Sequence, residues 1–153
     1  MNNLSKLSII LITRNSKSVL FDCLKALDNN DDITSSKNAE WIIVDNNSDD
    51  GSIEEVLKQY PKTIIIKNND NLGFAKAANQ GFNVSSKDFI LYINTDTEIK
   101  KDAISKLYKE IASDKDIAVI GPRLLRKNNT IQKSVYPEAT LYTEIFKPIV
   151  KLS

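Results

Sequence analysis

Two aspartates stand shortly after apolar runs, at places where a carboxylate could bind a ligand or a cation. Asp45 directly follows residues 41–44 (WIIV), and Asp96 follows residues 89–93 (FILYI) after two polar residues. A carboxylate in such a place is costly to desolvate without a partner. Asp45 is suited to accept a hydrogen bond from the imide N–H of a pyrimidine base. Asp96 is suited to coordinate Mg²⁺ or Mn²⁺, which prefer oxygen ligands.

Other residues with chemical potential stand at corresponding places. Thr13, Arg14 and Asn15 directly follow the first apolar run, residues 7–12. Gly73 comes a few residues after the third apolar run, and its lack of a side chain lets backbone approach a ligand closely. The helix expected to begin there would direct its N-terminal amides at the same place, which favours phosphate.

Apolar runs alternate with segments of helical spacing over the first 120 residues, which is typical of βαβ units and a mostly parallel sheet. Ligands of open α/β sheets bind outside the carboxyl ends of the strands. We therefore expect the polar residues after the strands to converge on one rim. The predicted strands are residues 7–12, 41–44, 63–67, 89–93 and 117–120, and the predicted helices are residues 17–27, 52–60, 73–84 and 102–113.

Local signals mark the ends of these elements. Ser16 is expected to cap the first helix. Ser52 with Glu55 three residues later has the pattern of a capping box. A hairpin is expected from residues 124–125 and 131–135, about the polar turn between them.

Composition excludes several classes of function. With 21 basic and 20 acidic residues, the net charge of +1 gives no support for a broad nucleic-acid or membrane footprint. The chain has no histidine, which removes Ser-His triads and His-ligated zinc. Cys23 is a lone cysteine in an apolar helical stretch and is expected to be a core residue.

The same features bear on location. A lone cysteine excludes an intrachain disulfide and favours a reducing compartment. Residues 1–6 lack the pattern of a signal peptide, and no run is long and apolar enough to span a bilayer. A cytoplasmic location is expected, with a peripheral position at the inner face of the membrane left open.

Taken together, the chain resembles family 2 glycosyltransferases, rhamnosyltransferase-like members in particular. The matching segments are SIILITRN, WIIVDNNSDDGS, NNDNLGFAKAANQGF, FILYINTDTEI and GPRLL followed by TIQKS. The resemblance implies the α/β GT-A fold, a Rossmann-like, mostly parallel sheet flanked by helices, truncated after the nucleotide-binding half. It divides the chain into a nucleotide-sugar-binding domain, residues 1–137, and a tail, residues 138–153, that begins the acceptor-binding part.

The resemblance also implies roles for single residues. Asn94 replaces the first aspartate of the family's DxD motif, which leaves Asp96 as the metal-binding carboxylate for Mg²⁺ or Mn²⁺. Asn79 lies in the helix beside the nucleotide, where a packing or capping role is an equal alternative, and Lys76 is expected on a solvated helix face. Nucleotide contacts are implied for Thr13, Arg14, Asn15, Asp45, Gly73, Asn79 and Asn94.

The implied reaction is inverting transfer of a sugar from a UDP- or dTDP-sugar to a glycan or lipid-linked acceptor, in cell-surface polysaccharide synthesis. The general base of family members lies downstream in the acceptor-binding half. Glu138 and Glu144 are the only late carboxylates, and neither matches that motif. Donor binding is therefore predicted, and the catalytic base is unassigned.

Three alternatives remain. A non-catalytic nucleotide-binding or interaction module would keep the fold without the chemistry. A phosphoacceptor signalling domain would need a clustered acidic pocket, which fits this chain order poorly. A Rossmann dehydrogenase would need GxGxxG after the first strand, and that motif is absent. Apolar residues at near-helical spacing in 141–152 are expected to support self-association or contact with a partner chain.

Overall fold

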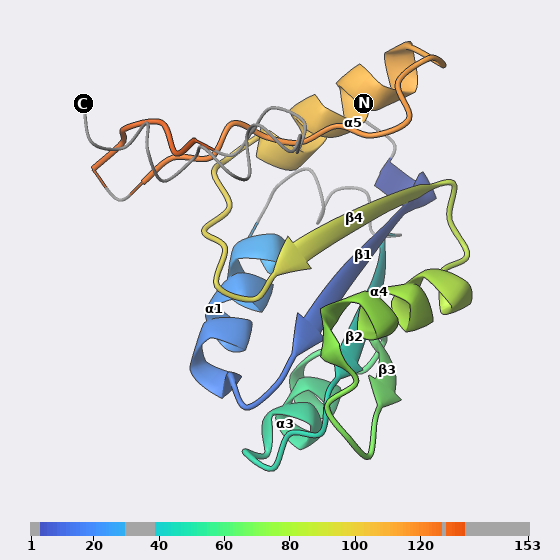
Figure 1. Ribbon diagram of the computed structural model, residues 1–153, viewed down its shortest axis with the longest axis vertical. Helices are drawn as coiled ribbons and strands as arrows, with labels where there is room; N and C mark the ends of the chain where they lie inside the picture. The colour runs from blue at the N-terminus through green and yellow to red at the C-terminus, as the bar shows by residue number, and fades with distance from the viewer. Residues whose placement is uncertain (1–3, 30–38, 127, 134–153) are drawn as a thin grey trace, which may run out of the picture. The chain divides into compact units, whose positions relative to one another are not determined.

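The computed structural model describes residues 4–29, 39–126 and 128–133. The chain forms two compact units, Met1–Val119 and Ile120–Ser153. The first unit contains a parallel four-stranded sheet with the strand order β3-β2-β1-β4 (Figure 1). Its elements are η1 (Leu4–Lys6), β1 (Leu7–Thr13), α1 (Lys17–Asp28), β2 (Glu40–Asp45), α3 (Ser52–Gln59), β3 (Ile64–Lys67), α4 (Gly73–Val84), β4 (Phe89–Asn94) and α5 (Ala103–Ser113).

The predicted α/β fold with a mostly parallel sheet is confirmed, and so are four of the five predicted strands and all four predicted helices. The fifth predicted strand, residues 117–120, is wrong, because these residues form no strand. Val119 is 87% exposed. A short apolar run becomes a strand only when it finds a neighbour to share backbone hydrogen bonds. Among the described residues, 117–120 have no such neighbour.

Side chains alternate between the two faces of the sheet, as the pleat requires. One face, with Ile9 and Leu11 of β1, packs against the apolar sides of α1, α3 and α5. The opposite face, with Ile10 of β1 and Val44 of β2, packs against Ala77 of α4. The chain thus crosses one face through α1 and α3 and the other through α4. As a result, the strand order reverses between β1 and β4.

The predicted capping box does not form. Gly51, not Ser52, occupies the N-cap position of α3, with a φ of 70° that favours glycine. The backbone N–H of Ser52 donates to the carboxylate of Asp50 (3.0 Å). Glu55 instead forms an ion pair with Lys17 (3.1 Å). The aspartate before the glycine has taken over the role that the sequence pattern assigned to Glu55.

Cys23 is buried, as predicted for a core residue. Burial, together with the negative charge of Asp96, raises the pKa of its thiol to about 11. A thiol with a raised pKa carries little thiolate at neutral pH, which is typical of a structural core cysteine.

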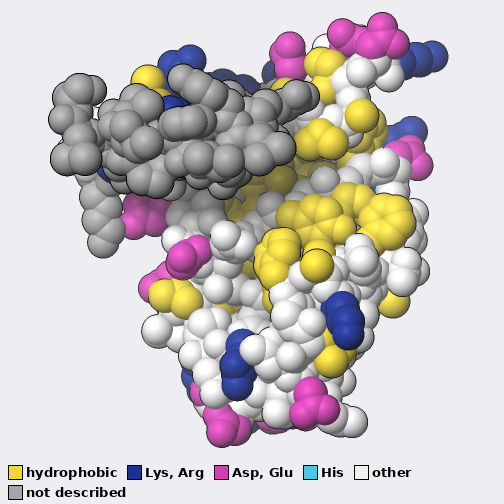
Figure 2. Space-filling view, viewed as in Figure 1, with side chains coloured by type: hydrophobic (Ala, Val, Ile, Leu, Met, Phe, Trp, Pro, Cys, Tyr) yellow, Lys and Arg dark blue, Asp and Glu magenta, His cyan; other side chains and the backbone are white. Residues whose placement is uncertain are grey.

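Apolar side chains gather on the surface over α4 and β4 (Figure 2). Phe74 and Phe82 of α4 are 60% and 55% exposed, and Tyr92 of β4 is 44% exposed. Within the part of the chain that the structure describes, β4 has a strand neighbour on one side only. Among the described residues, no helix is both long enough and apolar enough to cross a membrane.

The second unit contains the predicted hairpin as a single antiparallel bridge between Leu125 and Ile131. The N–H of Arg126 donates to the carbonyl of Thr130 (2.8 Å), and the N–H of Gln132 donates to the carbonyl of Leu124 (2.9 Å). Lys127 and residues 134–153 lie outside the described residues, and with them the predicted tail, 138–153, and its apolar stretch, 141–152. The domain boundary at residue 137 stays a prediction.

Packing of α4 on the sheet can be tested with Gly81→Ala. A Cβ at Gly81 would lie 2.6 Å from Cγ2 of Ile10. Overpacking of this kind costs about 1–3 kcal/mol, which outweighs the ~1 kcal/mol that alanine gains over glycine in a helix. We expect urea denaturation to show a free energy of unfolding lower by about 1 kcal/mol. The control is Gly121→Ala, where nothing lies within 4 Å of the Cβ. Equal stabilities of the two variants would contradict the close contact.

Candidate functional site

The carboxyl ends of the strands lie level along one rim of the sheet. The register pairs Thr13 with Asp45, Ile12 with Asn94, and Asp45 with Lys67. Because β1 lies between β2 and β4, the backbones of Asp45 and Asn94 are two strand spacings apart, roughly 10 Å. The predicted convergence of the strand ends on one rim is confirmed.

The reversal of strand order between β1 and β4 marks the place on this rim where a ligand would bind. Arg14 and Asn15 follow β1 there, and Asn94 and Asp96 stand at the end of β4. The side chains of all four are exposed. Thr13 is only 2% exposed, and its hydroxyl shares a hydrogen bond with that of Ser16 (2.8 Å). Ser16 stands at the N-cap of α1 as predicted, but its side chain caps no helix N–H.

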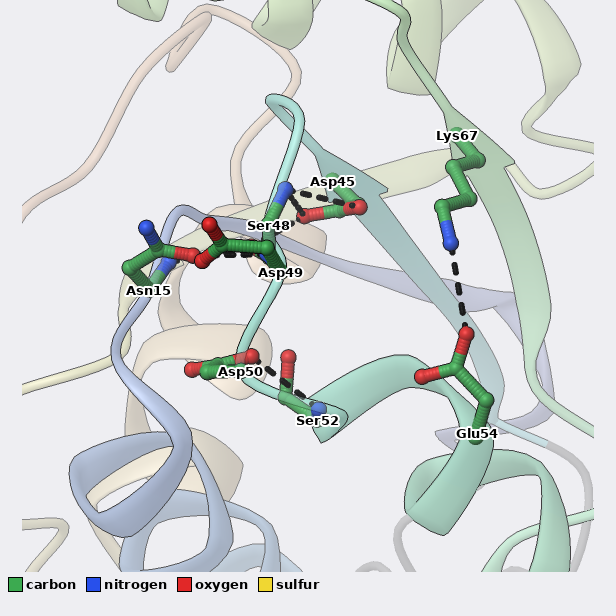
Figure 3. A network of polar contacts seen from close by, with 8 residues as sticks. All are labelled: Asn15, Asp45, Ser48, Asp49, Asp50, Ser52, Glu54 and Lys67. Atoms are coloured by element: carbon green, nitrogen blue, oxygen red, sulfur yellow. Dashed lines mark hydrogen bonds and ion pairs between the residues drawn. The ribbon is translucent and has the colours of Figure 1, made fainter.

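Asp45 is fully buried, and its carboxylate is held by one residue of the following loop (Figure 3). The backbone N–H of Ser48 donates to Oδ1 (3.1 Å) and Oδ2 (3.3 Å), and the Ser48 hydroxyl donates to Oδ1 at short range. These bonds supply the partner that a buried carboxylate needs. Asp45 has no exposed surface that a base could contact, so the predicted contact with a base stays a prediction.

Asn15 links the loop after β1 to the loop after β2. It has a φ of 45°, a left-handed conformation that asparagine tolerates better than most residues. Its backbone N–H donates to the hydroxyl of Ser48 (2.9 Å), and its side-chain Oδ1 accepts from the N–H of Asp49 (2.9 Å). Two of the polar groups of Asn15 are therefore used between the loops.

Asp50 is a residue of the site that sequence reasoning missed. Its Oδ2 accepts from the backbone N–H of Lys17 (3.0 Å), and its Oδ1 accepts from that of Ser52 (3.0 Å). Burial pushes the pKa of the Asp50 carboxyl up, but the hydrogen bonds from Ser52 and Lys17 outweigh it and leave the pKa below its ordinary value. An aspartate immediately before Gly51 at a helix start was the available signal.

A group of buried amides, also missed, fastens the start of α4 to the ends of β2 and β3. Asn68 donates to Oδ1 of Asn46 (3.0 Å) and exchanges two hydrogen bonds with Gln80 (2.9 and 2.8 Å). Asn46 also donates to the carbonyl of Gly73 (3.4 Å). Asn46 and Asn68 are 4% and 8% exposed. Asparagines directly after apolar runs were the signal in the sequence.

Gly73 begins α4 with a φ of 77°, and a Cβ there would have nothing within 4 Å. The backbone is therefore open to approach, as predicted, and its conformation favours glycine. The N–H of Gly73 donates to Oδ1 of Asn71 (3.1 Å). Asn79 lies six residues farther along α4, roughly 9 Å from the start of the helix, and is exposed.

The residues that could hold a metal ion are few. Within 4–29, 39–126 and 128–133, no group of three or more histidine, cysteine, aspartate or glutamate side chains could enclose an ion. Asp96 offers one exposed carboxylate. Magnesium commonly uses one or two carboxylates together with substrate phosphates. Asp96 therefore fits an ion that is shared with a phosphorylated ligand and does not fit a closed protein site.

An open groove of about 610 Å³ lies between α1 and α3, beside Asn15 and Asp50. Its charged lining side chains are Lys17, Lys25, Asp50 and Glu55. The two cations are balanced by two carboxylates, so the groove has no net attraction for phosphate.

Comparison with known proteins assigns the family. The family model of Glycosyl transferase family 2 matches residues 8–150. This chain belongs to glycosyltransferase family 2. The resemblance of its strand-end motifs to that family is thereby confirmed.

Similar proteins share its fold. A poly(ribitol-phosphate) beta-glucosyltransferase of Bacillus spizizenii is 24% identical over 87% of this chain and 21% of its own length. Structures of S. aureus TarS in complex with UDP-GlcNAc and of the mannosyltransferase PcManGT of Pyrobaculum calidifontis with GDP-Man and Mn²⁺ each match with a TM-score of 0.62. TarS is 24% identical, and the match covers 71% of this chain and 31% of the TarS chain. PcManGT is 18% identical, and the match covers 70% of this chain and 32% of the PcManGT chain. The chain spans 16% to 51% of the length of its curated relatives.

The hold of Ser48 on Asp45 can be tested by Asp45→Ala. The substitution leaves the Ser48 N–H and hydroxyl without their acceptor, and an unsatisfied buried donor costs about 1–3 kcal/mol. We expect the free energy of unfolding, measured in urea, to fall by about 2 kcal/mol. Asp49→Ala is the control, because the Asp49 side chain is exposed. A comparable loss in both variants would show that the Asp45 contacts contribute little.

Proposed function

We propose that this chain binds a nucleotide-sugar donor at the β1–β4 rim and forms the donor-binding half of an inverting glycosyltransferase. The observation that carries the proposal is the arrangement of the strand ends along one rim. The exposed carboxylate of Asp96 follows β4 on one side of the strand-order reversal, and α4 begins at Gly73 on the other side. The family membership supports the same reading. The acceptor is proposed to be a glycan or a lipid-linked sugar of cell-surface polysaccharide synthesis.

The pyrimidine base of the donor would lie against the loops after β1 and β2, near Thr13, Arg14, Asn15 and Asp45. A carboxylate has about four acceptor positions, so the contacts with Ser48 leave Asp45 some capacity for an imide N–H. Such a contact favours a pyrimidine, as in UDP- or dTDP-sugars. It requires the Ser48 segment to move aside, because Asp45 has no exposed surface.

The diphosphate would lie near the start of α4. The first N–H groups of a helix have no partner within the helix and attract anions. The N-termini of α1 and α3 already face the carboxylate of Asp50. The start of α4 instead has the neutral side chain of Asn71 on Gly73, which favours it for phosphate. Asn94 and, more weakly, Asn79 are proposed as further donor contacts.

A divalent ion, Mg²⁺ or Mn²⁺, would be held by Asp96 together with the donor phosphates. Charge on the departing nucleoside diphosphate would be neutralised by this ion, a Lewis-acid role. Asp96, close after the end of β4, would fix the position of the ion on the rim. The presence of Mn²⁺ and GDP-Man together in the PcManGT structure is consistent with the proposal.

Transfer itself needs a base that takes the proton from the acceptor hydroxyl as that hydroxyl attacks the anomeric carbon. No residue of this chain is assigned to that step, and Glu138 and Glu144 lie outside the described residues. The chain spans only part of the length of its relatives. Because no described residue is assigned as the base, the second candidate function is a nucleotide-binding module without turnover of its own.

Donor binding is tested by isothermal titration with UDP, dTDP and GDP, with and without Mn²⁺. We expect a pyrimidine diphosphate to bind, and Mn²⁺ to strengthen its affinity about tenfold, ~1.4 kcal/mol. Asp96→Asn should leave less than about a twofold effect of Mn²⁺, because an amide is a poor substitute for a carboxylate ligand.

Glu98→Gln is the matched control, since it removes one exposed carboxylate two residues away. A manganese effect of full size in Asp96→Asn would remove the metal assignment. Absence of binding by all three nucleotides would sink the donor proposal. Release of free sugar or transfer to an added acceptor would separate the enzyme from the module without turnover.

A further inference from the structure

One carboxylate connects the segment after β1, residues 14–17, with the loop after β2, residues 46–51. This inference rests on the proposed function. We propose that Asp50 is a positioning residue for the donor site, which holds these two loops together without touching the donor. Figure 3 shows Asp50 beside the start of α3, on the loop that also carries Ser48 and Asp49.

Each oxygen of Asp50 accepts from the first N–H of a different helix. Oδ2 accepts from Lys17, which begins α1, and Oδ1 accepts from Ser52, which begins α3. Helix N-termini carry partial positive charge and unpaired N–H groups. One half-buried carboxylate thus accepts a hydrogen bond from each helix start. Hydrogen bonds to a charged acceptor are stronger than neutral ones.

Other bonds between the two loops depend on the same spacing. Asn15 donates to Ser48 and accepts from Asp49, both at 2.9 Å. Side-chain bonds of this kind are sensitive to shifts well under 1 Å. If Asp50 no longer held the starts of α1 and α3 together, these bonds would lengthen together.

The connection then reaches the predicted base contact. The hydroxyl of Ser48 accepts from Asn15 and donates to Asp45. Asp45 and Thr13 stand at paired positions of β2 and β1. A displaced Ser48 would therefore change the orientation of the Asp45 carboxylate at the proposed contact with the base.

Direct contact between Asp50 and the donor is disfavoured by its charge and by its bonds. Both of its oxygens already accept helix N–H groups, and a carboxylate repels a diphosphate. Two further contacts join the same segments, one between the helices and one between the strand ends. Lys17 pairs with Glu55 of α3 (3.1 Å), and the N–H of Asn46 donates to the carbonyl of Thr13 (2.9 Å).

The test compares Asp50→Asn and Asp50→Ala with Asp49→Asn. Asp49→Asn removes the same charge from the adjacent, exposed side chain and keeps the Asp49 N–H that Asn15 binds. Affinity for UDP with Mn²⁺ is measured by calorimetry, at a temperature where circular dichroism shows each variant folded. We expect about tenfold weaker binding for Asp50→Ala, a smaller loss for Asp50→Asn, which keeps one acceptor, and no loss for Asp49→Asn.

A second readout distinguishes positioning from general destabilisation. Amide ¹H–¹⁵N spectra of the ligand-free chain should show shifts at Lys17, Ser52 and Asn15 in both Asp50 variants, and unshifted strand amides. Wild-type affinity in Asp50→Ala, or an unmoved Asn15 amide, would overturn the inference. If the wild-type chain binds none of the nucleotides, the proposed function fails first, whatever the amide spectra show.

Discussion

The parallel backbone ladder does not stop where the strands end, and the arrangement of the site depends on that extension. The N–H of Asn46 donates to the carbonyl of Thr13, and the N–H of Asn68 donates to the carbonyl of Asp45, each at 2.9 Å. Parallel strands share one direction, so their carboxyl ends share one rim. The additional bonds carry the alignment of β1, β2 and β3 one step into the loops. The side chains of these loops therefore project from backbone positions that hydrogen bonds fix, although the loops belong to separate βα units.

Much of the fold could be predicted because each strand signal was local. The runs that became β1 to β4 are short, rich in isoleucine and bounded by polar residues, and a helical pattern follows each of them. The run at 117–120 is also apolar, yet it forms no strand, and Val119 is largely exposed. Strand formation needs a neighbour, and the identity of that neighbour is not encoded in the run itself. This is why the fifth strand could not be judged from its own residues.

The site divides in the same way between local and long-range information. That polar residues follow each strand could be predicted, and they do stand on one rim. Which groups they bind could be predicted only in part, because some of the contacts join residues more than 30 positions apart, such as Asn15 with Ser48 and Lys17 with Asp50. The capping-box interpretation failed for the same reason. Glu55 pairs with Lys17 across the two helices, and the helix start is satisfied by the aspartate before Gly51.

Asp45, Asp50 and Asp96 differ in burial and in hydrogen bonding, and these differences distinguish their proposed roles. Asp45 has no exposed surface and is held by Ser48. Asp50 is bound to two helix starts, and those bonds hold its pKa below the ordinary value. Asp96 is exposed at the end of β4. A carboxylate whose oxygens already accept strong hydrogen bonds has little to gain from a cation, whereas an exposed one exchanges only water for it. This difference supports the proposed metal-binding role of Asp96, whereas the observed bonds of Asp45 and Asp50 hold the segment that follows β2 in place.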